Sequence, residues 1–98
     1  MNIQAIMKQA QKMQKEMMSE KEAIDKEIFI GTSSVVKVEV YGNKKIKSVK
    51  IESGNLDNDD LEMLEDMIVI AINDAINKID VETEKRMGRY TANMPGIF

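Results

Sequence analysis

A chain of 98 residues with a net charge of −3 and 43% hydrophobic residues is long enough for one small domain, and its composition excludes several classes of protein. Cysteine and histidine are both absent, which excludes disulfide frameworks, thiolate metal sites and the commonest general base. Without these side chains we expect no metal site and no cofactor. The longest apolar run, residues 67–72, has six residues, whereas roughly 20 are needed to cross a bilayer, so we also expect no membrane partner.

Charge is unevenly distributed along the chain. Residues 1–15 and residues 85–98 each carry a net charge of +3 without a single acid, whereas residues 52–84 carry −10. An asymmetry of this kind indicates an anionic partner that meets only part of the molecule. The acidic total argues in the opposite direction, because nucleic-acid-binding domains are usually basic as a whole.

Residues 2–25 are predicted to form a long amphipathic helix, because they are rich in Ala, Met, Lys, Gln and Glu, which are strong helix formers. At about 100° per residue, the apolar side chains from Ile3 to Ile24 fall on one face. Lys8, Lys12 and Lys15 fall on the opposite face. Taken alone, these three lysines predict an ordinary solvated helix face; the alternative is contact with the phosphates of a nucleic acid.

Three short strand-like segments follow the helix, at residues 27–31, 35–42 and 45–52. The middle segment alternates between valines and charged residues, which is typical of a strand with one buried face. Gly42 and Asn43 are predicted to form a two-residue hairpin turn with glycine at its first central position. Since both connections are short, the three segments are expected to form an antiparallel meander.

A second long helix is expected from Asp57, its predicted N-cap, to about Gly88. This helix is apolar on two sides around its middle, and one side alone can cover the sheet. The other side predicts a homodimer, since a second copy of the chain is the simplest cover. A buried polar pair within it, Asn73 and Asp74, is expected to set the register of the helices. The full predicted dimer interface consists of Met63, Met67, Ile70, Asn73 and Asp74.

Both predicted helices are longer than the sheet. They span about 36 and 45 Å against about 23 Å for a seven-residue strand, so their basic ends are predicted to project. Lys85, Arg86 and Arg89, at the end of the second helix, are therefore further candidates for DNA contact; the alternative is a charge complement to the helix dipole. Residues 1–90 are expected to form a single domain, followed by a flexible C-terminal tail at residues 91–98.

The order of these segments, together with particular stretches of sequence, resembles a known family. The most specific stretches are MKQAQKMQ at residues 7–14 and LEDMIVIAINDA at residues 64–75, and the chain closes on MPGIF. They are similar to the YbaB/EbfC family of bacterial nucleoid-associated proteins, over nearly the whole chain. The resemblance implies an α+β fold in the order α-β-β-β-α, a homodimer with protruding helix ends, and DNA binding. With this resemblance, we interpret Lys8, Lys12 and Lys15 as contacts for DNA phosphates.

The expected function is therefore that of a small homodimeric nucleoid-associated protein, cytoplasmic and located at the nucleoid, that binds duplex DNA through backbone phosphates. Weak sequence preference is expected, because a recognition helix rich in Arg, Asn and Gln is missing. An influence on nucleoid organisation and gene expression is a further implication of the resemblance.

The main alternative is a protein–protein adaptor that does not bind DNA and uses its Met-rich amphipathic helices to hold a partner helix. An enzyme is not expected, since no histidine is present to activate Ser33 or Ser34 and no glycine-rich phosphate loop follows a strand. We therefore expect no catalytic residue and no small-molecule substrate. Salt dependence separates the two remaining hypotheses, because phosphate contacts release counterions from DNA.

Overall fold

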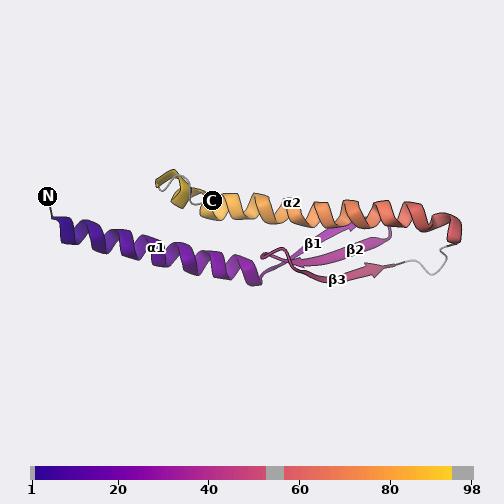
Figure 1. Cartoon of the computed structure of the whole chain (residues 1–98), viewed down its shortest axis with the longest axis horizontal. Helices are drawn as coiled ribbons and strands as arrows, with labels where there is room; N and C mark the ends of the chain where they lie inside the picture. Colours follow the sequence, from indigo (N-terminus) through magenta and orange to yellow (C-terminus); the bar gives the residue numbers. More distant parts are fainter. Residues whose placement is uncertain (1, 53–56, 94–98) are drawn as a thin grey trace.

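The computed structural model describes residues 2–52 and 57–93 and arranges two long helices around a small sheet (Figure 1). Its elements, in chain order, are α1 (Ile3–Lys26), β1 (Ile28–Ser33), β2 (Val36–Tyr41), β3 (Ile46–Ile51), a 3-10 turn η1 (Asn58–Asp60) and α2 (Leu61–Asn93). The predicted α+β class and the order α-β-β-β-α are confirmed. Within the described residues, neither long helix is apolar over enough of its length to cross a bilayer.

The sheet is the predicted antiparallel meander, with the strand order β1-β2-β3. Ser33 pairs with Val36, so β1 and β2 are joined by a loop of two residues, Ser34 and Val35. Ser34 has a positive φ of 51°, as expected for the first central residue of a type II′ turn. This turn lets the two strands continue their pairing to the end of the hairpin.

The turn predicted between β2 and β3 is confirmed in part: Gly42 and Asn43 are the central residues of a turn in which the Lys44 amide donates to the Tyr41 carbonyl over 2.8 Å, but the hairpin loop is longer than two residues. The Tyr41 amide donates to the Lys45 carbonyl over 2.9 Å, so the loop contains three residues. Its last residue, Lys44, has the positive φ of 73°, a combination found in hairpins with a three-residue loop. Asn43 favours this longer loop, because its side-chain oxygen accepts a hydrogen bond from the Lys45 amide at 2.9 Å.

Gly42 is needed for a close approach to α1. A Cβ at this position would lie 1.8 Å from the carbonyl oxygen of Ile24, in the last turn of the helix. The Gly42 amide also donates to the carbonyl of Glu27, the residue that caps α1, over 2.9 Å. The second hairpin is therefore packed directly against the end of the first helix.

α2 covers one face of the sheet, and the two form the main core. The fully buried residues of this core are Val36, Val38, Val40, Ala71, Ala75 and Ile79. Gly31, in β1, sets the distance between the layers, since a Cβ there would lie 1.9 Å from the Ala71 carbonyl oxygen and 2.7 Å from the Ala75 amide nitrogen. Only glycine at position 31 allows the helix backbone to lie this close to the strand.

β3 is left largely uncovered by α2. Val49 pairs with Val38, so both side chains point to the same face of the sheet. Val38 is fully buried, but Val49 is 43% exposed, and Ile46 and Ile51 are 51% and 42% exposed. The single chain therefore has an uncovered apolar strip along β3, formed by these three residues.

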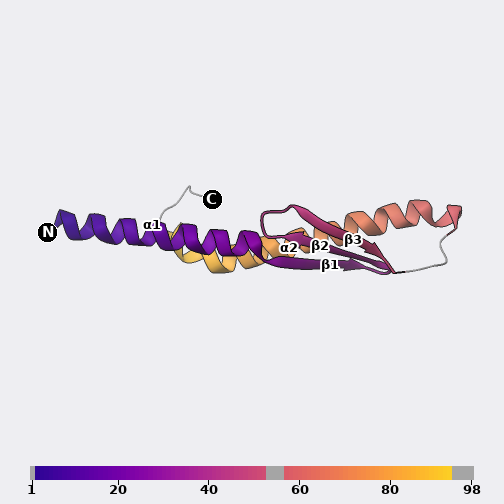
Figure 2. The ribbon, with the colours of Figure 1, turned by 90° about the horizontal axis from the view of Figure 1, so that it is seen from below.

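α1 leaves the sheet and extends past the C-terminal end of α2, so the molecule is 71 Å long and 19 by 14 Å across (Figures 1 and 2). Its second half packs against α2, where Ile24 is buried in a small cluster with Met87 and Tyr90. Ile3 and Ile6, at its other end, are 69% and 50% exposed. The predicted overhang of the first helix is confirmed.

α2 ends later than predicted. It continues to Asn93, past the expected domain boundary at residue 90, with Gly88 in its interior. A single glycine within a helical stretch is tolerated, and the proline that would stop the helix comes only at position 95. The rest of the predicted tail, residues 94–98, lies outside the described residues.

Gly31→Ala is expected to destabilise the fold by about 3 kcal/mol, because the added methyl group would force α2 away from the sheet. Urea unfolding followed by far-UV circular dichroism measures the loss. Gly88→Ala is the matched control, since a Cβ at that position meets no atom within 4 Å. The free energy of unfolding of this control should rise by about 0.5–1 kcal/mol, as expected when glycine is replaced by alanine in a helix interior. Equal stabilities would contradict the close approach at Gly31.

Candidate nucleic-acid interface

The first half of α1 forms a basic arm, residues 3–15, whose N-terminal part projects beyond the end of α2 (Figure 1). Asn2 starts the helix, because its side-chain oxygen accepts hydrogen bonds from the amides of Gln4 (3.1 Å) and Ala5 (3.3 Å). The exposed lysines of the arm are Lys8, Lys12 and Lys15. Among the residues that the structure describes, none of the three is paired with a carboxylate. Their charges are therefore open to an anion from outside.

Two lysines of the arm share a groove with the end of α2. The groove has a volume of about 420 Å³ and is lined by Lys12, Lys15, Glu16, Ser19, Glu20, Arg89 and Tyr90. Arg89 is held in place by its neighbour: its guanidinium donates to the Tyr90 hydroxyl and lies 4.6 Å from the centre of the ring. The fold thus brings together predicted cations from the two ends of the sequence, while Lys8 lies further out along the arm.

Arg86 differs from the other predicted cations, because it joins α2 to α1. Its Nε donates to Glu20 over 2.6 Å, and its Nη1 donates to Glu27. Glu82, one turn earlier on α2, lies 4.0 Å away. Only 24% of the Arg86 side chain is exposed, and the hydrogen bonds to Glu20 and Glu27 raise its pKa above the ordinary value. Lys85, the preceding residue, is exposed.

The acids at the start of α2 lie at the opposite end of the molecule from the basic arm (Figures 1 and 2). There Asp57 and Asp60 form a capping box before α2, in which the Asp57 amide donates to the Asp60 carboxylate over 3.0 Å. Acids are favoured at this position, because the helix dipole is positive at its N-terminus. These carboxylates therefore stabilise the start of α2, far from the lysines of α1.

The predicted dimer interface is only partly exposed in the single chain. Met63 and Ile70 are 57% and 56% exposed, and Asn73 is exposed as well. Met67 instead packs against the main core, and Asp74 is half-buried. The expectation that Asn73 and Asp74 are buried as a pair is therefore wrong for the single chain, because the two side chains point in different directions around the helix.

Asp74 and Lys78 cover the outer edge of β1. The Asp74 carboxylate accepts from the Thr32 amide (3.1 Å), and it lies 3.4 Å from the Lys78 ammonium. The same ammonium donates to the Ile30 carbonyl over 2.8 Å. Backbone groups at an otherwise open sheet edge are thereby satisfied. The signal in the sequence is the i,i+4 spacing of the acid and the lysine, which is common to many exposed helix faces and does not by itself indicate a sheet edge.

The apolar strip on β3 was also missed as an interface. Alternation along a strand predicts which of its residues share a face, but it does not predict whether a helix reaches that face. Ile46, Val49 and Ile51 are uncovered because α2 lies over the other two strands. Met63 and Ile70 of α2 are exposed as well, but Ile70 lies one turn before Asp74, on the side of α2 that faces the outer edge of β1 and not β3.

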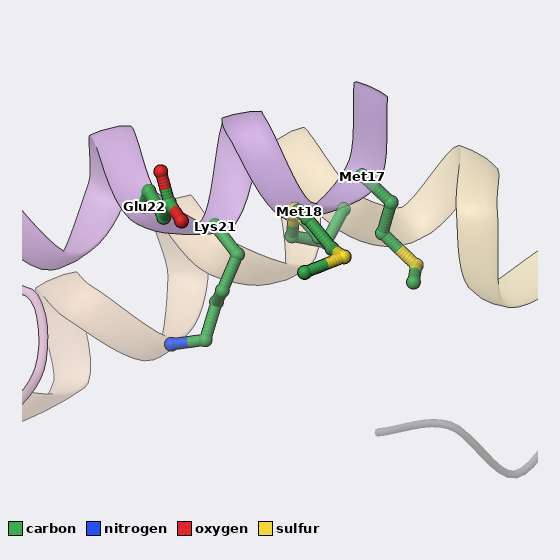
Figure 3. Close-up of a pocket in the computed structure, with 5 residues that line it drawn as sticks. Met17, Met18, Lys21 and Glu22 are labelled. Carbon is green, nitrogen blue, oxygen red and sulfur yellow. The ribbon is translucent and has the colours of Figure 1, made fainter. Parts of the chain in front are cut away.

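An apolar groove lies between the second half of α1 and α2 (Figure 3). It has a volume of about 200 Å³ and is lined by Met17, Met18, Lys21, Glu22 and Met87. Met18 is 56% exposed at its mouth. Methionine adapts its shape to varied apolar groups, so this groove is the feature that favours the adaptor hypothesis.

Asp74→Asn is expected to lower stability at neutral pH, because it weakens the bonds that hold α2 to the edge of β1. The Thr32 amide, followed by the charge of Lys78, keeps the pKa of Asp74 below its ordinary value of 3.8. The stabilising contribution is therefore present above pH 3.8 and is lost as the pH falls through the lowered pKa. Thermal unfolding midpoints should differ most near pH 7 and converge in acid.

Asp80→Asn is the control for this experiment, because Asp80 forms an exposed ion pair with Lys44 and should change the midpoint little at any pH. If the unfolding midpoint of Asp74→Asn stays below that of the parent protein by the same amount from pH 7 into acid, the assigned role of the Asp74 charge is contradicted.

Comparisons with known protein sequences all point to one family of DNA-binding proteins. The sequence model of the YbaB/EbfC DNA-binding family matches residues 1–94. A nucleoid-associated protein of Enterococcus faecalis is 43% identical over 98 residues, which cover 98% of this chain and 94% of that protein. A nucleoid-associated protein of Lactococcus lactis subsp. cremoris is 41% identical over 97 residues, covering 97% and 98%. The crystal structure of an uncharacterized Helicobacter pylori protein has a similar fold, with a TM-score of 0.61 and 23% identity over 98% of this chain and 99% of that one.

Proposed function

Because this chain belongs to the YbaB/EbfC DNA-binding family, we propose that it is a nucleoid-associated protein that binds duplex DNA mainly through backbone phosphates. The observation that carries the proposal is the basic arm, whose three lysines are exposed and have no carboxylate partner among the described residues. Lysine binds phosphate as a point charge and does not read base edges from such a position. Weak sequence preference is therefore part of the proposal.

The proposed contact surface lies at the basic end of the molecule. It consists of Lys8, Lys12 and Lys15 on α1 and Lys85 and Arg89 on α2. Arg86, the sixth cation predicted to contact DNA, is bonded to Glu20 and Glu27 and is left out of the proposed surface. The groove that Lys12, Lys15 and Arg89 share supports this choice, because it concentrates cations from both helices. Residues 1–15 carry +3 and no acid, which favours a phosphate chain along the arm, while Glu16 and Glu20 line the groove at its base.

We further propose that the functional unit is a homodimer. The exposed apolar side chains of Met63 and Ile70 on α2 and of Ile46, Val49 and Ile51 on β3 support it. Full burial of one such side chain contributes about 1.5–3 kcal/mol, so covering several of them on association can hold two copies together. The proposed interface includes Met67, Asn73 and Asp74 at its border. A dimer would present two basic arms to one DNA molecule.

The proposed location is the nucleoid, in the cytoplasm, in line with the names of the relatives from Enterococcus faecalis and Lactococcus lactis. The family is one of DNA-binding proteins, and no catalytic activity is proposed. An influence on nucleoid organisation and on gene expression would follow from phosphate binding at many sites along the chromosome.

The second candidate function is that of a protein–protein adaptor, which the groove at Met17, Met18 and Met87 favours. An apolar contact with a partner helix would depend little on salt. DNA binding through phosphates would instead weaken steeply as salt rises. A salt series with a short duplex therefore decides between the two functions.

Replacing Lys8, Lys12 and Lys15 together by Ala should weaken binding to all duplexes about equally, because phosphates are the same in every sequence. If each lysine contacts one phosphate, the slope of log K against log salt concentration should become shallower by about 2.7 for each arm. Fluorescence anisotropy titrations of two unrelated duplexes, each at several salt concentrations, measure both effects.

Replacing Lys37, Lys45 and Lys50 by Ala is the matched control, because these three sheet lysines change the net charge of the chain by the same amount. The control should keep most of its affinity. Equal losses in the two triple variants would show that net charge alone determines binding and would rule out the arm as a specific contact surface.

Ile70→Lys is expected to give a folded monomer with reduced DNA affinity, since the side chain is 56% exposed in the single chain and a charge would oppose a dimer contact. Size-exclusion chromatography with light scattering reports the mass. Ile30→Lys, at a side chain 42% exposed on the other face of the sheet, is the control and should leave the mass unchanged. A monomeric Ile70→Lys protein with full affinity would separate DNA binding from assembly.

A further inference from the structure

Resting on the proposed function, we infer that Arg86 is a positioning residue for DNA binding: it fixes the direction of the basic arm and offsets an acid inside the DNA groove. Its role is distinct from that of Lys12, Lys15 and Arg89, which line the groove itself. Arg86 instead lies behind the groove, with its guanidinium bonded to Glu20 and Glu27.

The geometry of Arg86 suits it to hold a helix in one direction. Glu20 lies in α1, and Glu27 is the residue that caps its C-terminal end, seven positions later and about 10 Å further along the axis. The Nε of Arg86 donates to the first and its Nη1 to the second. A planar donor that is bound at two points along a helix limits both the tilt and the rotation of that helix.

The other contacts between α1 and α2 specify direction poorly. Ile24 is buried beside Met87 and Tyr90, and Met13 and Met17 complete this cluster. Methionine side chains repack easily, so a cluster rich in them tolerates a change of angle between the helices. The arm projects from this contact as a helix, so a small rotation at the contact moves Lys8 further than the residues that lie beside α2.

Arg86 also changes the electrostatics of the groove. Glu20 is one of two acids that line it, beside Lys12, Lys15 and Arg89. The bond between Arg86 and Glu20, at 2.6 Å, places a positive charge directly against that carboxylate. Glu16, the other acid, has no ion pair with any residue in the described part of the chain. A DNA phosphate in the groove would therefore be repelled less by Glu20 than by Glu16.

Removal of the two acids that bind Arg86 is expected to change the DNA affinity in opposite directions for a charge effect and for a positioning effect. Glu20→Gln combined with Glu27→Gln removes two negative charges near the groove, which by charge alone would strengthen DNA binding. If Arg86 positions the arm, the double variant should instead bind a short duplex about threefold or more weakly, because the arm loses its fixed direction. Glu16→Gln is the matched control on the same helix and should bind equally well or more tightly.

Two variants of Arg86 separate positioning from direct contact. If its charge touched DNA, Arg86→Lys would bind almost as well as wild type, since lysine also binds phosphate. If Arg86 positions the arm, Arg86→Lys should lose nearly as much affinity as Arg86→Ala, because one ammonium cannot span both glutamates. Circular dichroism of every variant checks that the fold is retained. If Arg86→Ala does not fold, the comparison of the Glu20→Gln, Glu27→Gln double variant with Glu16→Gln still tests the inference.

A distance measurement tests the arm without DNA. The chain has no cysteine, so spin labels can be placed at Gln4→Cys on the arm and Lys45→Cys on the hairpin, with unlabelled protein in excess to isolate distances within one chain. The distance distribution should be narrow in the parent protein and broader in the Glu20→Gln, Glu27→Gln variant. An unchanged distribution, or a double variant that binds DNA more tightly, would overturn the inference. Absence of DNA binding by wild type would refute the proposed function while leaving this distance test valid.

Discussion

The close approach of α2 to β1 is the constraint on which the rest of the structure depends. At Gly31 the two backbones are so near that a Cβ would lie 1.9 Å from the Ala71 carbonyl oxygen. This contact, together with the buried valines of β2, fixes α2 along the sheet. A helix of 33 residues placed in this way must continue well beyond the strands, and it meets α1 there. The position of the basic end is thus set by packing at a distant glycine.

The contact between α1 and α2 combines an adaptable apolar cluster with directional polar bonds. The cluster of Ile24, Met87 and Tyr90 excludes water but is small for a helix of 24 residues. Arg86 adds hydrogen bonds to two carboxylates of α1 across this contact. Apolar burial favours association of the two helices without specifying their angle, whereas a planar guanidinium bound at two points specifies it. The two kinds of interaction are complementary.

An acidic protein of a DNA-binding family requires its charges to be separated in space. The capping box at Asp57 and Asp60 and the lysines of the basic arm lie at opposite ends of a molecule 71 Å long. The Debye length at physiological ionic strength is only about 8 Å, so carboxylates at one end have little effect on phosphates at the other. An elongated shape therefore reconciles a net charge of −3 with a surface suited to an anion.

The sequence alone determined the local elements. The periodicity of α1 and α2, the alternation of β2 and the short connections predicted the helices and the meander, because these signals depend on neighbours along the chain. Exposed lysines on the face opposite the apolar stripe of α1 followed in the same way. Only the tertiary structure decided that Arg86 bonds to Glu20 and Glu27, that Asp74 covers the edge of β1, and that β3 is left uncovered. Each of these depends on how closely and at what angle distant segments pack, which no local pattern contains.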